Sequence, residues 1–463
     1  MSIGTYFGLN VAVNAMNTAQ EAEAVISNNI ANSSTQGYTT ETANIVESDP
    51  MTDLPSGQLG QGSSVESVTR SVNDFYNQQV NVSTSSYNAQ NSLMTNLDQI
   101  QTIMNATSST SLQGSIDDFF TAFQTLSTEP QNSAAGQSAI EQAQNLSSSF
   151  STVQNQLLST ISNLNSVVSG SANGSEVSTV NQYATQLNQL NQQISNITST
   201  GQNANQLLDQ RDELLNNLSQ LGNIKYSENS DGSVSVIFGT TNIVNTSGGF
   251  STTTFTAADT SGVTSGSIYG NMQGISAAQN VIQTLGSLQS AIADGVNSQL
   301  ELGYQNNSSM QGVPLFNVTS SNVTDGSTTT PVTSLSVTNI TSDQLAVAQN
   351  ASAPGDGSNA SAIAALQNST SLTDSNGNPL NSTPDIYYAT LITNIGSQAS
   401  TAQSNQQTAD AILQQNQSMQ ESVSSVNVDD QMAQMVEFQN AYSAAAKIIN
   451  TQNEMLQTLI QEA

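Results

Sequence analysis

Small and apolar residues recur at alternating spacings of three and four along the first thirty residues. Six of them follow one another at intervals of three, four, three, four and four. This spacing places them on one face of an α-helix over residues 9–30, and alanines on such a face let a partner helix approach closely. The sequence therefore predicts an N-terminal helix with one narrow seam, formed by Ala12, Ala15, Ala19, Ala22, Ile26 and Ile30.

The last helical stretch, which begins near residue 428, carries two such seams side by side. Two adjacent seams form an apolar face too wide for one partner helix to cover. We therefore expect this helix to pack against its own chain and against other copies of the chain. Asn427 suits the N-cap position, and Asp429 and Asp430 in the first turn indicate helix capping rather than a metal site. The first seam contains Val428, Met432, Met435, Gln439, Tyr442, Ala446, Ile449, Asn453, Leu456 and Ile460, and the second contains Phe438, Ala441, Ala445, Ile448, Gln452, Met455 and Leu459.

These two end segments supply the predicted assembly interface. Its residues are Ala12, Ala15, Ala19, Ala22, Ile26 and Ile30 at one end, with Val428, Met432, Met435, Phe438, Tyr442, Ala445, Ile448, Ile449, Met455, Leu456, Leu459 and Ile460 at the other.

Between the ends, the same helical spacing returns in several long segments with Gln, Asn and Ser on their polar faces. We expect helices around residues 87–104, 146–168, 180–197, 207–221 and 275–302, and a further helix opened by Pro384 that runs toward Val423. Two tracts rich in Thr, Val and Gly, residues 224–268 and 313–347, favour β-structure, and Asp231-Gly232 marks a hairpin turn. The predicted fold class is mainly α with inserted β: terminal helices forming a coiled coil, a long helical-bundle stem and small β-rich outer domains.

The expected domain organisation follows from these tracts. Residues 1–45 with 425–463 form a terminal coiled-coil assembly domain. Residues 46–222, 270–308 and 360–424 form a helical stem, and residues 223–269 and 309–359 form the β-rich outer part.

Charge and composition narrow the function classes. The chain has 463 residues, a net charge of −30 and only four basic side chains, so it offers no basic patch for nucleic acid and no apolar span for membrane insertion. With so few bases the chain avoids large positive self-repulsion in acid, which indicates an acidic extracellular setting, although a general composition bias explains the same pattern. The first residues lack the features of a cleaved signal peptide, so we expect export by another route.

Candidate chemistry is sparse. Without His or Cys there is no basis for a zinc site, a cysteine nucleophile or histidine acid–base catalysis, and we predict no enzymatic activity, no cofactor and no metal. The neighbouring pairs Asp117-Asp118 and Asp429-Asp430 diverge on a helix. The many Asn-x-Ser/Thr matches are weak evidence for glycosylation in a chain so rich in these residues.

Three segments resemble a known family. Ser27-Asn28-Asn29-Ile30-Ala31-Asn32 with Thr35-Gln36-Gly37-Tyr38-Thr39 resembles the N-terminal signature of the bacterial flagellar rod, hook and hook-associated proteins. The segment from Ser425 to Asp430 with Phe438-Gln439-Asn440-Ala441-Tyr442 resembles their C-terminal helix. Leu207-Leu208-Asp209-Gln210-Arg211-Asp212-Glu213-Leu214-Leu215 narrows the resemblance to the flagellar hook-associated protein 1 family, which forms the hook–filament junction. The chain has Thr40 where relatives commonly carry Arg, which puts any polar contact of that position in doubt.

The resemblance implies a structural protein that self-assembles into a junction ring through its terminal helices. It implies as partners the chain itself, the hook protein, the second junction protein and an export chaperone at the C-terminal region, with a location outside the cell after type III export. Arg211, with Asp209 and Asp212, is the predicted structural cluster, in which Arg211 pairs with a carboxylate such as Asp212 or Glu213. The alternatives are another flagellar axial protein, namely a hook or second junction protein, and a surface adhesin that uses the β insert.

Overall fold

The structure is a computed structural model that describes residues 6–51, 58–104, 111–170, 174–306, 308–326 and 328–462. The side chains of Leu459 and Ile460, two predicted interface residues, lie outside this description. Contacts divide the chain into two compact units, each assembled from distant segments: unit 1 comprises Met1–Ser86, Val180–Phe255 and Ala409–Ala463, and unit 2 comprises Tyr87–Thr179 and Thr256–Thr408. Along the described residues, none of the helices combines the length and apolar character needed to cross a bilayer.

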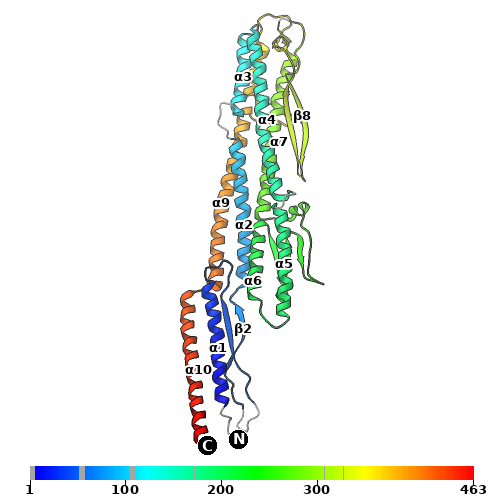
Figure 1. Cartoon of the computed structure of the whole chain (residues 1–463). Helices are drawn as coiled ribbons and strands as arrows, with labels where there is room; N and C mark the ends of the chain where they lie inside the picture. Colours follow the sequence, from blue (N-terminus) through cyan, green and yellow to red (C-terminus); the bar gives the residue numbers. More distant parts are fainter. Residues whose placement is uncertain are drawn as a thin grey trace. The chain divides into compact units, whose positions relative to one another are not determined.

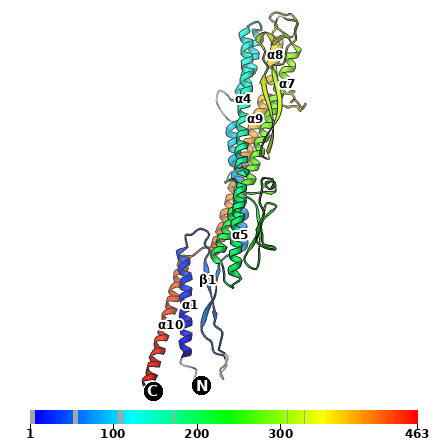
Figure 2. The same cartoon turned by 45° about the vertical axis from the view of Figure 1, so that its right-hand side comes forward.

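One part of unit 1 consists of the terminal helices and a β-ribbon. Helix α1 (Tyr6–Ala31) lies between α10 (Val428–Glu462) and the ribbon formed by β1 (Glu41–Glu47) and β2 (Ser63–Arg70), as Figure 1 and Figure 2 show. The strands pair antiparallel, with Glu41 opposite Arg70. The two helices occur where the apolar spacing predicts them.

The β1–β2 ribbon was missed by the sequence reasoning, which assigned residues 46–222 to a helical stem. All of its residues are half-buried or exposed, and nine of the fifteen are Ser, Thr, Asn or Glu, so the apolar alternation that marks a strand is weak. A half-covered ribbon of this kind leaves little trace in a hydrophobic pattern.

The other part of unit 1 packs two helices against a sheet. Helices α5 (Glu176–Thr198) and α6 (Asn205–Leu221) contact a four-stranded sheet in the order β3 (Ile224–Glu228), β4 (Val234–Phe238), β5 (Thr241–Asn245), β6 (Ser251–Thr252). The predicted hairpin is present: β3 and β4 are antiparallel, and Gly232 between them adopts a φ of 76°, a conformation that favours glycine. The buried rings of Phe238 and Phe255 pack edge to face, with their centroids 4.9 Å apart. The start of α2 (Asp74–Met104) and the end of α9 (Pro384–Ser424) complete unit 1.

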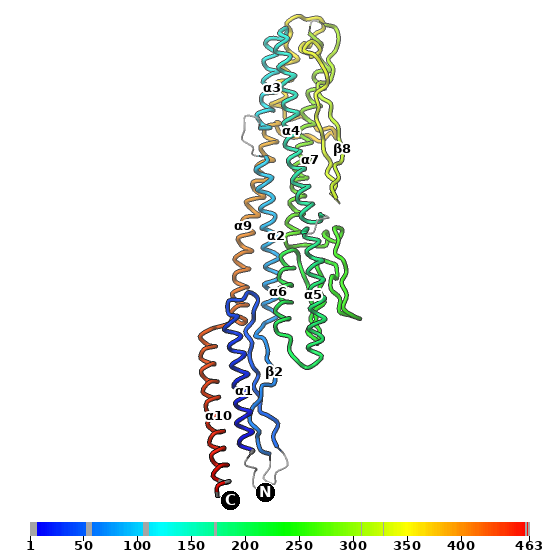
Figure 3. The backbone as a smooth tube through the Cα atoms, viewed as in Figure 1, coloured from blue at the N-terminus to red at the C-terminus, as the bar shows by residue number. Residues whose placement is uncertain are grey.

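Unit 2 is built around a continuous apolar core. Helices α3 (Leu112–Thr128), α4 (Ser133–Ser169), α7 (Gly266–Leu302) and α8 (Ser358–Ala365) pack with the C-terminal part of α2 and the N-terminal part of α9. Figure 3 shows the backbones of α3, α4 and α7 together with α2 and α9. A ribbon of β8 (Phe316–Asp325) and β9 (Thr328–Val337) packs on α7, and β7 (Tyr304–Gln305) pairs with β10 (Ala346–Ala348).

Helix α7 begins nine residues earlier than the sequence analysis predicts. The predicted β tract ends at residue 268 and the predicted helix begins at residue 275, so Gly270 and Gly274, in the first turns of α7, lie between the two predictions. Both glycines lie where α7 contacts α2. A Cβ at Gly270 would clash with the carbonyl oxygen of Ala89, and a Cβ at Gly274 would lie 2.6 Å from the side chain of Asn96. The glycines let α7 and α2 pack closely.

The predicted fold class, mainly α with inserted β and paired terminal helices, is confirmed. The predicted grouping into terminal, stem and outer domains stays a prediction. The contact-based units place the two β tracts apart, the first in unit 1 and the second in unit 2.

Candidate assembly interface

The terminal helices α1 and α10 run antiparallel and contact each other along most of their length. Two contacts fix the register: Gly8 of α1 lies against the side chain of Gln452, and Asn29 donates a hydrogen bond to Gln431 over 2.8 Å. A straight antiparallel pair with these two contacts places Ala22 opposite Phe438. Small side chains on α1 thus leave room for large ones on α10.

The buried seam of α10 combines residues from both predicted seams. It recurs at spacings of four and three and begins with Gln431, which neither predicted seam contains, whereas Gln452 near its end belongs to the second predicted seam. Its buried and half-buried members include Gln431, Met435, Phe438, Tyr442, Ala445, Ile449, Gln452 and Leu456.

Apolar side chains remain exposed on both flanks of this seam. Met432 and Val436, each 56% exposed, lie on one flank of the first turns, and Ile448 (50%) and Met455 (51%) lie on the other flank of the later turns. Val428 is 38% exposed beside Met432. One partner helix therefore leaves part of the apolar face uncovered, as the two-seam pattern predicts.

Helix α1 has two covered faces, which corrects the prediction of one narrow seam. Ala12, Ala19, Ala22 and Ile26 of the predicted seam are buried, and Ala15 and Ile30 are half-buried. A second, polar face contacts the β1–β2 ribbon: Asn14 donates to the Gln61 carbonyl over 2.9 Å and Thr18 to the Ser63 carbonyl over 2.8 Å. This face escaped the sequence analysis because its contacts are hydrogen bonds.

Asn29 is the polar centre of the terminal helix pair. It has no solvent exposure, and its amide donates to the carbonyl of Glu41 and to Gln431, each over 2.8 Å. Its Oδ1 accepts from the Tyr38 hydroxyl at 2.7 Å and from the Glu41 amide at 3.0 Å. All four hydrogen-bonding positions of the side chain are thus satisfied, and they join α1, β1 and α10. The sequence analysis quoted Asn29 only as part of a family signature.

Two buried arginines and the carboxylates of α6 form a second polar cluster. Arg70 at the end of β2 contacts Asp209 at 2.7 Å and Asp212 at 3.1 Å. Arg211 contacts Asp212 at 2.8 Å, Glu228 at 3.3 Å and the Gly232 carbonyl at 2.7 Å. Arg211 therefore pairs with one of its two expected partners, Asp212, and with a strand carboxylate instead of Glu213. Arg70 was missed, although as one of four bases it was the strongest available signal.

Electrostatics hold this cluster in its charged form. Burial lowers the pKa of Arg211, but the carboxylates of Asp212 and Glu228 outweigh that effect and raise it above its ordinary value. The Tyr38 hydroxyl lies beside Glu41 and Asp209, and burial together with these two negative charges raises its pKa to about 12.

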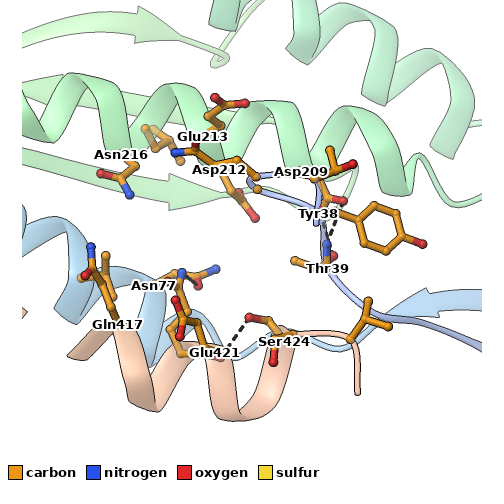
Figure 4. Close-up of a pocket in the computed structure, with 18 of the residues that line it drawn as sticks. Tyr38, Thr39, Asn77, Asp209, Asp212, Glu213, Asn216, Gln417, Glu421 and Ser424 are labelled. Carbon is orange, nitrogen blue, oxygen red and sulfur yellow. Dashed lines mark hydrogen bonds between the residues drawn. The ribbon is translucent and has the colours of Figure 1, made fainter. Parts of the chain in front are cut away.

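A polar groove of about 450 Å³ opens beside this cluster within unit 1. Figure 4 shows Asp212 of α6 on the side that faces Asn77 of α2 and Glu421 of α9, with Asp209 beside Thr39; Glu213 also lines the groove. Thr39 closes one end, where its backbone amide and hydroxyl donate to Asp209 over 3.3 and 2.7 Å. Thr40 keeps a polar contact, because its amide and hydroxyl donate to the Ser424 carbonyl over 2.9 and 3.1 Å.

The groove does not indicate catalysis. Two of its acidic side chains, Asp209 and Asp212, contact Arg70, and Asp209 also accepts a hydrogen bond from the Thr39 hydroxyl. The described residues contain no group of three or more His, Cys, Asp or Glu that could hold a metal ion. The lining residues come from α2, α6, α9 and the segment after α1.

Family models match three parts of the chain. The model described as the flagellar hook-associated protein FlgK helical domain matches residues 97–316. The model for the flagella basal body rod protein matches residues 9–39, and that for the C-terminal part of the flagellar basal body rod FlgEFG protein matches residues 417–462.

Two curated relatives are named flagellar hook-associated protein 1. Flagellar hook-associated protein 1 of Salmonella typhimurium is 34% identical over 228 residues, which is 48% of this chain and 40% of that protein. The alignment thus spans well under half of the relative's length. Flagellar hook-associated protein 1 of Bacillus subtilis is 25% identical over 506 aligned positions, covering 98% of both chains.

A solved structure shares the fold. The flagellar hook junction protein FlgK from Burkholderia pseudomallei matches with a TM-score of 0.59 at 17% identity, covering 75% of this chain and all of that chain.

Proposed function

The chain belongs to the flagellar hook-associated protein 1 family, and from this premise we propose that it is a structural component of the bacterial flagellum that joins hook to filament. It does so by self-assembling into a junction ring through its terminal helices. The observation that carries the proposal is the unequal burial of α10, which has one seam covered by α1 and apolar side chains exposed on both flanks.

Energetics support assembly through these flanks. Full burial of a Val, Ile or Met side chain contributes roughly 1.5–3 kcal/mol. Each α10 exposes Met432, Val436, Ile448 and Met455, which are already half covered, and each copy in a ring repeats the gain. Two separate flanks allow one chain to contact a neighbour on either side, which a closed ring or helical assembly requires.

We propose the partners accordingly. Other copies of the chain cover the flanks of α10, the hook protein and the second junction protein contact the two ends of the ring, and an export chaperone binds the C-terminal region before assembly. The proposed location is the external flagellum, and neither nucleic acid nor membrane insertion is part of the proposal. The proposed role is structural and not enzymatic: the sequence contains neither His nor Cys, and Asp209 and Asp212 of the groove are paired with Arg70 within unit 1.

The acidic setting belongs to the same proposal. With 34 acidic residues and four basic ones, protonation of the carboxylates leaves little positive charge to repel itself. Assembled rings should keep their structure as the pH falls. A pH titration followed by electron microscopy tests this, and loss of the rings near about pH 3, below the usual carboxyl pKa, would contradict it.

Paired serine substitutions on each flank test the assembly role. We expect Met432→Ser with Val436→Ser, and separately Ile448→Ser with Met455→Ser, to leave hooks without filaments in cells that make only the variant. Electron microscopy of detached flagella measures this, and circular dichroism of the purified chain establishes that α10 still folds. Asn440→Ser, an exposed polar position on the same helix, is the matched control. Normal filaments with both double variants would refute the proposal.

A further inference from the structure

Asparagines followed by a hydroxyl residue at the second position are concentrated in one stretch of the chain. Between residues 306 and 383, nine of eleven asparagines stand in an Asn-x-Ser/Thr triplet with x other than Pro, against nine of 42 in the rest of the chain. In that stretch 26 of the 78 residues are Ser or Thr, so composition alone predicts a match at about one asparagine in three. The concentration therefore exceeds what composition explains.

Most of these asparagines project into solvent from unit 2. Six of the nine have exposed side chains and lie on strands, turns or a 3-10 helix, outside the α-helices. Asn306 is half-buried, and Asn307 lies outside the described residues. The six exposed asparagines are Asn317, Asn322, Asn339, Asn350, Asn368 and Asn381.

Asn359 is the exception, and its structure explains why. It has no solvent exposure, and its amide donates to the carbonyls of Gln299 and Ala346 over 3.1 and 2.7 Å. Its Oδ1 accepts from Gln299 over 2.7 Å. A substituent on this nitrogen would break the contacts that fix the start of α8, so Asn359 provides an internal negative control.

Two of the exposed asparagines lie on a strand that lacks the usual protection of sheet edges. β8 and β9 form a two-stranded ribbon whose register runs without a bulge, and no third strand of the described residues pairs with it. Most of β8 is exposed, and the two strands together contain one charged residue, Asp325. An exposed, uncharged strand invites pairing with another chain unless charge, proline or bulk prevents it.

We propose that the exposed asparagines of this stretch, Asn317 and Asn322 above all, are attachment sites for N-linked sugars. The asparagine Nδ2 bonds to the anomeric carbon of a nucleotide-activated sugar, the carbon–oxygen bond to the diphosphate breaks, one amide proton is lost and the nucleoside diphosphate leaves. The hydroxyl residue two positions later is what the transferring enzyme recognises. On β8 the sugars supply the bulk and hydration that charge provides in other proteins, and they prevent edge-to-edge association.

Glycopeptide mass spectrometry of the chain purified from the cells that naturally make it tests the proposal. The expected result is a sugar mass on peptides containing Asn317 and Asn322, and none on the peptide containing Asn359. Unmodified Asn317 and Asn322 in all recovered peptides would overturn the proposal. So would modification of Asn359 to the same extent, since burial would then not govern the choice.

Substitutions at the hydroxyl positions separate this modification from any other at the same strand. Thr319→Ala and Thr324→Ala keep both asparagines, yet they should abolish the sugar at Asn317 and Asn322 respectively. Thr319→Ser should retain it, and Ser320→Ala, an exposed neighbour outside the triplets, should leave it unchanged. A sugar that persists on Asn317 in Thr319→Ala would refute the assignment.

Discussion

Helix α7 of unit 2 and helix α10 of unit 1 are of similar length, 37 and 35 residues, yet they treat their apolar side chains in opposite ways. Along α7, residues such as Val281, Leu285 and Ile292 have no exposure at all. Along α10, Met432, Val436, Ile448 and Met455 are at least half exposed. On α7 only Leu302, at the C-terminal end, is an exposed large apolar side chain, whereas α10 leaves several of them exposed along its length.

The largest effect on the free energy of unfolding is expected in the buried core of unit 2. Phe119 has no exposure and packs against Phe120, Phe123 and Phe316 at centroid distances of 5.1 to 5.5 Å. Phe119→Ala should reduce the free energy of unfolding by about 4 kcal/mol, because it removes a large buried ring and leaves a cavity. Denaturant unfolding of the purified chain measures this. Phe75→Ala, at a position 62% exposed, is the matched control and should change it by less than about 0.5 kcal/mol.

A smaller effect is expected at the arginine cluster of unit 1. Arg211→Ala removes one of the two arginines that contact Asp212 and leaves the Gly232 carbonyl without its guanidinium donor, so it should cost about 3 kcal/mol of unfolding free energy. Lys225→Ala removes one positive charge from an exposed position nearby and serves as control. Equal stability of the two variants would mean that the cluster does not hold α6 to the sheet.

Asn29 tests the terminal pair itself. Asn29→Ala removes the hydrogen bonds to Gln431, Glu41 and Tyr38 and should destabilise the terminal helix pair by about 2 kcal/mol. The main expected observation is faster amide exchange along α10. Hydrogen exchange with mass spectrometry resolves α10 from the rest of the chain. Asn10→Ala, an exposed position of the same helix, should leave exchange unchanged. An equal acceleration throughout unit 2 would show that the effect is not local.

The smallest effect is expected in alkali. The pKa of Tyr38 is raised from 10 to about 12 in the folded chain, so the folded state favours the neutral hydroxyl. Its contribution to stability is complete below pH 10 and is lost as the pH rises from 10 toward 12. Amide exchange of the β1–β2 ribbon should therefore accelerate in that window. In Tyr38→Phe the exchange should already be faster at neutral pH and depend less on pH there, and an identical pH dependence would contradict the assignment.

The sequence predicted the features of the fold that apolar periodicity controls. The boundaries of α1 and α9, the Asp231-Gly232 hairpin and the excess apolar face of α10 all follow from spacing or turn chemistry. The features that the sequence did not predict are polar: Gln431 in the buried seam of α10, its partner Asn29 on α1, and Arg70 as partner of Asp209 and Asp212. Hydrogen bonds between segments far apart in sequence have no periodicity, so a pattern of hydrophobic positions cannot reveal them.

The β tract of residues 224–269 illustrates the same limit. From its sequence alone, the tract is typical of an insert whose removal leaves a helical stem intact. In the structure, Gly232 and Glu228 are partners of Arg211, Val234 exchanges two hydrogen bonds with the buried Asn191, and residues from 266 onward already belong to α7. Deleting the tract would remove contacts of α5 and α6 and so disturb folding. Loss of function in such a variant would therefore not distinguish an adhesin that binds through the tract from a junction protein that no longer folds.

The hydrogen bond between Asn29 and Gln431 has a consequence for the order of folding. The two residues are 402 positions apart, and unit 1 is built from three segments of the chain. Contacts of such long sequence separation form late, because the intervening chain must be ordered or brought to loop closure first. Unit 2 contains long stretches that can collapse locally, whereas the terminal arm closes only when the final segment arrives. In a chain that emerges gradually, the surface of α10 that we propose to contact neighbouring copies is therefore the last to be completed, which would delay association until the rest of the subunit has formed.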